Sequence, residues 1–313
     1  MTSLPRLLLV FAAGIAVMAG FAGRAAAQGC QLRLEGLGRI ALARPYDPLA
    51  QRAGEQRADL TVRRVSGACD FALGAGPGQA AGTSRHMSQG ASRLAYGIYT
   101  DGNHGRPLRD PDTGGADSLI LGRFGGRDQI DLEIAVLVPD GQMVAAGPYA
   151  DTVVFTLYEL VDGVPGRVLD ARSVQVTTMV SAVAGFEIVI EGARKALRGG
   201  LLGKLDFGEI TQGRRLGFDL EARGNLGYDI EIGSENGGVL AGEGQAKDST
   251  IPYLLTLDGR GLDLRQPAQV SAAPATDFGR TVNSHRFEVE IGDVGQAAAG
   301  KYRDDITVTV VTR

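Results

Sequence analysis

Hydrophobic and polar residues alternate in short segments along most of the chain, which is the pattern of half-buried β-strands. Turns rich in glycine separate these segments, and almost no window shows the period of an amphipathic helix. The clearest alternating segments are 58–65, 129–138, 152–160, 186–190, 216–222, 228–232, 253–257, 287–291 and 305–311. Many short strands joined by turns predict an all-β protein built from β-sandwiches.

The chain begins with a segment that does not fit this pattern. Arg6 opens a short basic region, an apolar run extends from Leu7 to Phe21, and three alanines precede Gln28. We expect a signal peptide over residues 1–27, because such a run followed by small residues is what signal peptidase cleaves. A membrane anchor and a lipid-modified Cys30 are the weaker alternatives. No membrane span is predicted in the mature chain, which we expect to be exported.

An internal repeat divides the mature chain. The segment Ala146 to Leu157 resembles Ala299 to Val310, and the two share the pattern Ala-Gly-x-Tyr-x-Asp followed by an alternating strand. Two copies of one domain are therefore expected, at residues 28–180 and 181–313. Tyr149 and Tyr302 open the last strand of each repeat, and each hydroxyl is expected to bind backbone as a structural feature of the fold.

Composition excludes several functions. The 313 residues include 46 Gly, 3 His and 2 Cys, with a net charge of −4. So small a negative charge does not favour nucleic-acid binding through phosphate neutralisation. Two cysteines are too few for a four-thiolate zinc site, and the histidines lie far apart in sequence. No cofactor or metal is predicted.

Two motifs could suggest other chemistry. The glycine-rich loop from Asp101 to Asp117 is acidic, but the register of a calcium-binding EF-hand fails at Gly105, so a solvated hairpin loop is the better interpretation. Ser84 and His86 could belong to a hydrolytic triad, but the sequence lacks a Gly-x-Ser-x-Gly elbow. We therefore predict that the protein is not an enzyme.

Cys30 and Cys69 are the only cysteines of the chain. Because an oxidising compartment favours their pairing, we predict one disulfide that ties the first strand of the first domain to a later strand. The alternative is a pair of free, buried thiols.

An ordered set of short motifs resembles the spore coat protein U domain family. In the first half the matching residues are Gly67 to Gly74, Arg85-His86-Met87, Leu94 to Asp101 and Gly147 to Val153. In the second half they are Asp206-Phe207-Gly208, Asn225 to Tyr228, Ser234 to Gly238, Tyr253 and Tyr302 to Asp305. The family supplies the subunits of archaic (Csu-like) chaperone–usher pili of Gram-negative bacteria.

This resemblance implies two tandem immunoglobulin-like β-sandwiches, of which the second lacks its final strand and is completed by a donor strand. It implies three partners: a periplasmic chaperone, an outer-membrane usher and a neighbouring subunit that donates the strand. Only Gln28 and Gly29 lie between the predicted cleavage site and Cys30, so the chain is expected to receive a strand without donating one.

These features predict a tip adhesin of an archaic pilus, exported through the periplasm to the cell surface and serving attachment and biofilm formation. The alternative is a secreted structural coat or surface-layer protein without an adhesive role. An exported β-sandwich enzyme is a third and weaker interpretation.

The first domain needs another source for its last strand. The segment Arg172 to Val180 alternates and places Val174, Val176, Thr178 and Val180 on one face. It directly follows the last repeat strand of the first domain, so we expect it to complete that domain in cis. An additional strand of the second domain and an extended linker are the alternatives.

Overall fold

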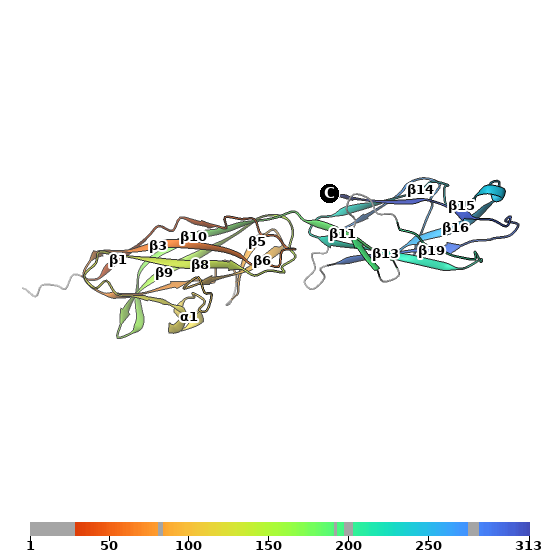
Figure 1. The fold of residues 1–313 in the computed structure, drawn as a ribbon. Coiled ribbons are helices and arrows are strands. Elements are labelled where there is room, and N and C mark those ends of the chain that lie inside the picture. The colour runs from red at the N-terminus through yellow and green to blue at the C-terminus, as the bar shows by residue number, and fades with distance from the viewer. Residues whose placement is uncertain (1–28, 81–83, 191–192, 197–202, 275–281) are drawn as a thin grey trace, which may run out of the picture.

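The computed structural model describes residues 29–313 apart from 81–83, 191–192, 197–202 and 275–281 (Figure 1). The predicted signal peptide, residues 1–27, lies outside the described residues. The described chain consists mainly of strands that form two units lying end to end (Figure 1), which confirms the all-β prediction. Within the described ranges, none of the helices has the length and apolar character needed to traverse a bilayer.

The first unit is one ten-stranded sheet with two very short helices between β6 and β7. Its elements are β1 (Gln31–Glu35), β2 (Arg39–Ala41), β3 (Gly54–Ser66), β4 (Asp70–Ala75), β5 (Arg85–Gln89), β6 (Ser92–Tyr99), α1 (Pro111–Gly114), η1 (Ala116–Ser118), β7 (Ile120–Gly122), β8 (Gln129–Val138), β9 (Gly147–Val161) and β10 (Val164–Val180).

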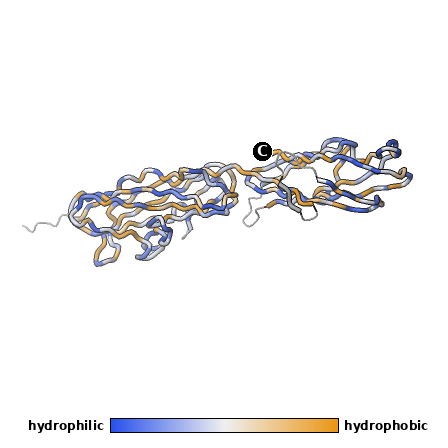
Figure 2. The backbone as a smooth tube through the Cα atoms, viewed as in Figure 1, coloured by the Kyte–Doolittle hydropathy of each residue, from blue (hydrophilic) through white to orange (hydrophobic). Residues whose placement is uncertain are grey.

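The sheet curls into two layers around one core. The strands follow the order β1-β3-β8-β6-β5-β9-β10-β2, and β4 and β7 branch from β9. Alternation assigns each side chain to a face: Leu60 and Val62 of β3 point into the core with exposures of 1% and 0%, whereas Asp59 and Arg63 are exposed. Hydrophobic and hydrophilic stretches accordingly alternate along the tube in both units (Figure 2).

Strand β4 is buried on both faces because a loop covers its outer side. A Cβ on Gly74 would meet Asp110 Oδ1 at 2.7 Å and the Arg109 carbonyl at 3.0 Å. Glycine therefore allows the loop that carries α1 to lie directly on the sheet. The acidic loop between Asp101 and Asp117 thus covers a β-sheet in this fold.

The second unit repeats much of this architecture. Its elements are β11 (Ala184–Ile190), β12 (Ala193–Ala196), β13 (Arg215–Gly224), β14 (Tyr228–Ser234), β15 (Val239–Gly242), η2 (Gly244–Ala246), β16 (Thr250–Leu257), β17 (Arg260–Leu262), β18 (Ala268–Ala272), β19 (Asn283–Ile291), β20 (Tyr302–Arg303) and β21 (Ile306–Thr312).

The order β11-β13-β19-β16 in one layer corresponds to β1-β3-β8-β6 in the first unit. In the other layer β21 pairs antiparallel with β14, as β9 pairs with β4. The register agrees with the sequence repeat: Glu159 lies opposite Phe71, and Thr312, 153 residues after Glu159, lies opposite Tyr228. Strand β21 is therefore the counterpart of β9.

The repeated tyrosines have equivalent hydrogen bonds in the two units. The Tyr149 hydroxyl donates to the Ala145 carbonyl (2.9 Å) and the Tyr302 hydroxyl to the Ala298 carbonyl (2.6 Å), in each case four residues upstream. Each hydroxyl also bonds a serine hydroxyl, that of Ser92 or of Ser249. The Ala-Gly-x-Tyr-x-Asp repeat is thus a corner of the fold that occurs once in each unit.

Every strand pairing among the described residues joins strands of the same unit. Residues 181–183 connect β10 to β11. This network favours the expected division into domains at 28–180 and 181–313, which remains a prediction and which we use below as the first and second domain.

Candidate functional site: an open strand edge

In the first domain β9 has a strand along each side. Strand β4 pairs with it from Asp70 opposite Leu160 to Ala75 opposite Phe155, and β10 pairs with it from Val164 opposite Val161 to Val180 opposite Gly147. The inward side chains of β9 are Val153, Phe155 and Leu157, each 0% exposed. A strand flanked in this way has all of its backbone groups within reach of partners.

Strand β10 contains the four residues expected on the completing strand. Val174, Val176, Thr178 and Val180 are 0%, 0%, 6% and 2% exposed. They lie opposite Val153, Asp151, Tyr149 and Gly147 of β9. The other edge of β10 pairs in parallel with β2. The segment is therefore an inner strand of the first domain.

In the second domain β21 is flanked on one side. It pairs with β14 from Ile306 opposite Ser234 to Thr312 opposite Tyr228 and ends the three-stranded order β18-β14-β21. In the part of the chain that the structure describes, its other side has no strand partner. We call this side of β21 the open edge. It is the place that β10 takes beside β9.

The side chains that surround the place of β10 are fully buried in the first domain, and those around the same place beside β21 are less buried. Ile306, Val308 and Val310, the inward residues of β21, are only partly buried, whereas the β9 residues are fully buried. On the opposite side, Leu32 and Leu34 of β1 are 4% and 2% exposed in the first domain. Their counterparts on β11 are only partly buried: Phe186, Ile188 and Ile190. The second core thus has apolar surface along its open edge that the first core covers with β10.

A partly buried carboxylate lies at the start of the open edge. Asp304 accepts hydrogen bonds from the Tyr253 hydroxyl (2.5 Å), the Ser234 hydroxyl (2.6 Å) and the Asn236 amide (3.0 Å). Burial, followed by the hydrogen bond to Asp304, raises the pKa of Tyr253 well above its ordinary value, so the hydroxyl remains a donor. These bonds fix the chain where β21 begins.

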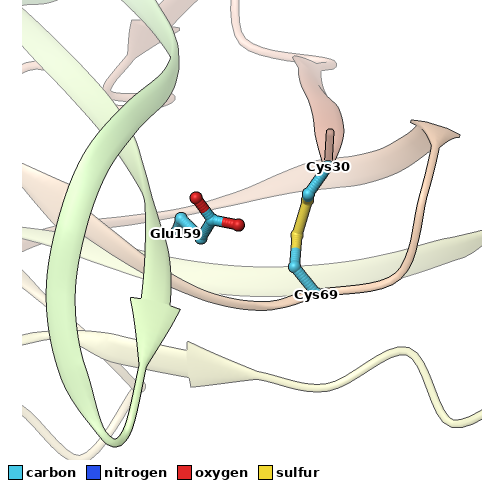
Figure 3. Close-up of side chains that lie close together, drawn as sticks. All are labelled: Cys30, Cys69 and Glu159. Atoms are coloured by element: carbon cyan, nitrogen blue, oxygen red, sulfur yellow. A yellow bond between two sulfur atoms is a disulfide. The ribbon is translucent and has the colours of Figure 1, made fainter. Parts of the chain in front are cut away.

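The predicted disulfide between Cys30 and Cys69 is confirmed, with Cα atoms 5.9 Å apart. The Glu159 carboxylate points toward it (Figure 3), and the three side chains bring potential ligand atoms within 4.8 Å. Both sulfurs are bonded to each other, and Glu159 pairs with Arg167 at 2.7 Å. Arg167 also donates to the Cys30 carbonyl (3.0 Å). The cluster is therefore a cross-linked and ion-paired corner.

Five exposed apolar side chains of the first domain lie on β3, β7, β9 and β10. Val161 and Val164 are 54% and 64% exposed and flank the turn at Asp162-Gly163, where the β9–β10 hairpin projects (Figure 1). Further members are Val65, Leu121 and Val168, each 54–55% exposed. Val65 and Val168 line one cleft of about 390 Å³. We call these five residues the distal apolar surface.

Leu108, Leu119 and Phe124 lie in loops, yet they are only 0%, 3% and 5% exposed. The ring of Phe124 packs on Phe71 with centroids 5.7 Å apart. The signal for the exposed hairpin was an Asp-Gly pair flanked by valines, which is typical of a two-residue hairpin turn. Asp162 and Gly163 both have positive φ, at 52° and 80°.

Two curled β-sandwiches with equivalent tyrosine corners, one of them with an open strand edge, define an immunoglobulin-like fold. Residues 19–156 match the family model described as Spore Coat Protein U domain. No curated protein matches the chain.

Solved structures similar to the chain include tip subunits of pili. One is a chain from the complex of chaperone CsuC with tip adhesion subunit CsuE, from archaic Csu pili of Acinetobacter baumannii. Its sequence identity is 15%, the match covers 89% of this chain and 99% of that chain, and the TM-score is 0.36. The CupB6 tip adhesin of Pseudomonas aeruginosa has 10% sequence identity and a TM-score of 0.42, and the match covers 90% of this chain and 98% of that chain. CfaE, the adhesive subunit of CFA/I fimbria of enterotoxigenic Escherichia coli, has 10% sequence identity and a TM-score of 0.40. That match covers 90% of this chain and 81% of that chain.

Proposed function

We propose that the protein is the tip adhesin subunit of an archaic chaperone–usher pilus and mediates attachment and biofilm formation. The open edge of β21 is the observation that carries this proposal. An extended segment can add to an exposed strand edge through backbone hydrogen bonds, while alternate side chains enter the core. The same edge left uncovered is an aggregation hazard, so a partner that covers it is required.

The first domain supplies a template for the segment that would bind. The repeat places Ile306, Asp304, Tyr302 and Gly300 where β9 has Val153, Asp151, Tyr149 and Gly147. A donor in the register of β10 then presents four residues to them, of the kinds found in β10: Val, Val, Thr and Val. Each fully buried aliphatic side chain contributes roughly 1.5–3 kcal/mol, so three are comparable with much of a small domain's stability.

This chemistry assigns the partners. A neighbouring pilus subunit provides the alternating donor segment in the fibre, a periplasmic chaperone covers the edge before assembly, and an outer-membrane usher exchanges one for the other at the cell surface. In the first domain β10 takes the same place in cis, so that domain needs no partner strand. The subunit is therefore incomplete only at its second domain.

The distal apolar surface supports the adhesive part of the proposal. It lies at the end of the first domain opposite the link to the second domain (Figure 1), and hence away from the open edge. Exposed apolar patches on a protein surface mark interaction sites. An apolar target surface, either abiotic or hydrophobic cell material, is the chemistry that five exposed aliphatic side chains fit.

A fusion tests the proposal. Because β21 ends beside the link between the domains (Figure 1), a strand appended there can turn back and run along β21. We would append a copy of residues 161–180 directly after Arg313, since the repeat aligns Arg313 with Leu160. The copy then reproduces the β9–β10 register along β21. The fused protein is expected to be monomeric, with a higher unfolding midpoint for the second domain.

The matched control carries the same appended copy with aspartate at the positions copied from Val174, Val176 and Val180. It has the same length and the same turn but cannot enter an apolar core. If the native copy raises neither the midpoint nor the monomer fraction above this control, the second domain does not accept a strand and the proposal is wrong.

A further inference from the structure

The link between the two domains is bound closely to the first domain. Ser181, the first residue after β10, donates from its amide to the Tyr46 carbonyl (2.8 Å), and the Tyr46 amide donates to the Met179 carbonyl (2.7 Å). Tyr46 is 2% exposed, and its hydroxyl accepts from the Gln142 amide (2.8 Å). The first residue of the link is therefore part of the structure of the first domain.

One side chain of the second domain holds the rest of the link. Asn225 lies in the turn between β13 and β14 and is 4% exposed. Its Oδ1 accepts from the Val183 amide (2.9 Å), and its backbone amide donates to the Val183 carbonyl (3.0 Å). A Cβ on the preceding Gly224, at φ +140°, would overlap that carbonyl, so the turn and the link are in direct contact.

The same side chain crosses to the first domain. Asn225 Nδ2 donates to the Ser181 carbonyl (2.8 Å) and to the Val144 carbonyl (3.0 Å). Val144 precedes β9 and is 5% exposed, and the bond joins residues 81 positions apart. An amide side chain has two N–H donors and one oxygen, and here all of them are used on the link and on the first domain. Buried polar bonds of this kind specify one arrangement, because breaking them leaves unsatisfied groups.

We infer that Asn225 is a latch that fixes the orientation of the second domain relative to the first. Strand β10 continues into β11 after only three residues, so a load applied at one domain reaches the other through this link. With the latch closed, the distal apolar surface and the open edge keep a constant geometry. This inference concerns the link alone and holds whether or not the open edge takes a donor strand.

Distance measurements on the full mature chain test the latch. Spin labels would be attached through non-canonical amino acids at Arg52 and Lys247, one exposed position in each domain, which leaves the disulfide intact. Electron–electron double resonance is expected to give one narrow distance peak for the parent chain. Asn225→Ala should broaden it and shift its centre. Asn225→Asp, which keeps the oxygen that binds Val183 and loses both donors, should broaden it as well.

Asn236→Ala is the matched control. It removes an asparagine of the same domain whose side chain donates only to the Arg303 carbonyl (3.2 Å), within the second domain, and its peak should remain narrow. Circular dichroism of each variant verifies that both domains remain folded. If Asn225→Ala does not fold, Asn225→Asp is used for the distance measurement in its place. A narrow peak at the parent distance in a folded Asn225 variant overturns the inference. So does a broad peak in the parent chain, which would show that the link is a flexible tether.

Discussion

At the scale of single residues, each domain contains a buried tyrosine that donates to an aspartate, which is buried in the first domain and partly buried in the second. The Tyr96 hydroxyl donates to Asp151 Oδ2 at 2.6 Å, and Asp151, 1% exposed, also accepts from the Gln79 amide at 2.9 Å. The Tyr253–Asp304 pair is its counterpart in the second domain. Burial, followed by the bond to the carboxylate, raises the pKa of Tyr96 well above its ordinary value. The first pair joins β6 to β9, and the second joins β16 to the residues just before β21.

Tyr96→Phe removes the donor and leaves a buried carboxylate with fewer partners. We expect it to lower the free energy of unfolding of the first domain by roughly 1–3 kcal/mol at neutral pH, measured by urea denaturation. The control is Thr113→Val at an exposed position. It should change the free energy of unfolding little, because the Thr113 hydroxyl donates to a backbone carbonyl at the surface. Equal stability of Tyr96→Phe and the parent would contradict a structural role for the pair.

The raised pKa adds a pH dependence to the same residue. A tyrosine whose pKa is raised in the folded state stabilises the fold fully below its unfolded pKa of about 10, and this contribution decreases as the pH rises above that value. The parent chain should therefore lose stability more steeply between about pH 9 and 11 than Tyr96→Phe. Urea unfolding across this range measures the difference between the two slopes, and parallel slopes would show that Tyr96 does not contribute.

At the scale of elements, the two domains differ in the strand beside β9 and β21. Strand β10 places its alternate side chains in the first core, whereas the same place beside β21 has no strand in the described residues. The partly buried residues of β11 and β21 in the second domain are the result. A single chain thus contains a completed and an open version of the same fold, and each serves as the reference for the other.

Val176→Ala tests the role of β10. It deletes two buried carbons from a side chain that is 0% exposed, so the first domain should lose about 2 kcal/mol of unfolding free energy, measured by urea denaturation. Gln175→Ala is the matched control on the same strand, because Gln175 is exposed on the outer face. If both substitutions have equally small effects, β10 is a peripheral extension and does not complete the core.

At the scale of the whole molecule, the distal apolar surface belongs to the first domain, and the open edge runs along β21 of the second domain (Figure 1). Three of its five residues, Val161, Val164 and Val168, are carried by the β9–β10 hairpin, so β10 also presents part of this surface. Under the proposed function, the distal end stays free while a partner holds the second domain.

Substituting Val161, Val164 and Val168 by serine should reduce attachment of the complemented protein to polystyrene beads several-fold, since about 25 cal/mol is lost for each Å² of apolar contact. The matched control substitutes Leu49, Val154 and Met179 by serine. These residues belong to the same domain, are 42–49% exposed and lie outside the distal apolar surface. A similar loss of attachment in both triple variants would show that binding is not localised at the distal end.

Much of the fold follows from local sequence patterns. The alternation of apolar and polar residues predicts strands because side chains in a strand point to opposite faces with a period of two. The Ala-Gly-x-Tyr-x-Asp repeat predicts two related domains because each copy forms one corner by hydrogen bonds four residues apart, at Tyr149 and at Tyr302. The disulfide was predictable because an exported chain with two cysteines has one possible internal pairing.

The tertiary structure decides which apolar residues are exposed and which segments meet. Leu108 and Phe124 lie in loops, but these loops fold onto the sheet, and both residues are buried. Val161 and Val164 flank the turn of the β9–β10 hairpin and are exposed. Asn225 binds Val144 across 81 positions of the chain. The sequence by itself determined the strands, the repeat and the cross-link, because those depend on neighbouring residues or on composition. Exposure, the open edge and the latch depend on contacts between segments far apart in sequence, which only the folded chain brings together.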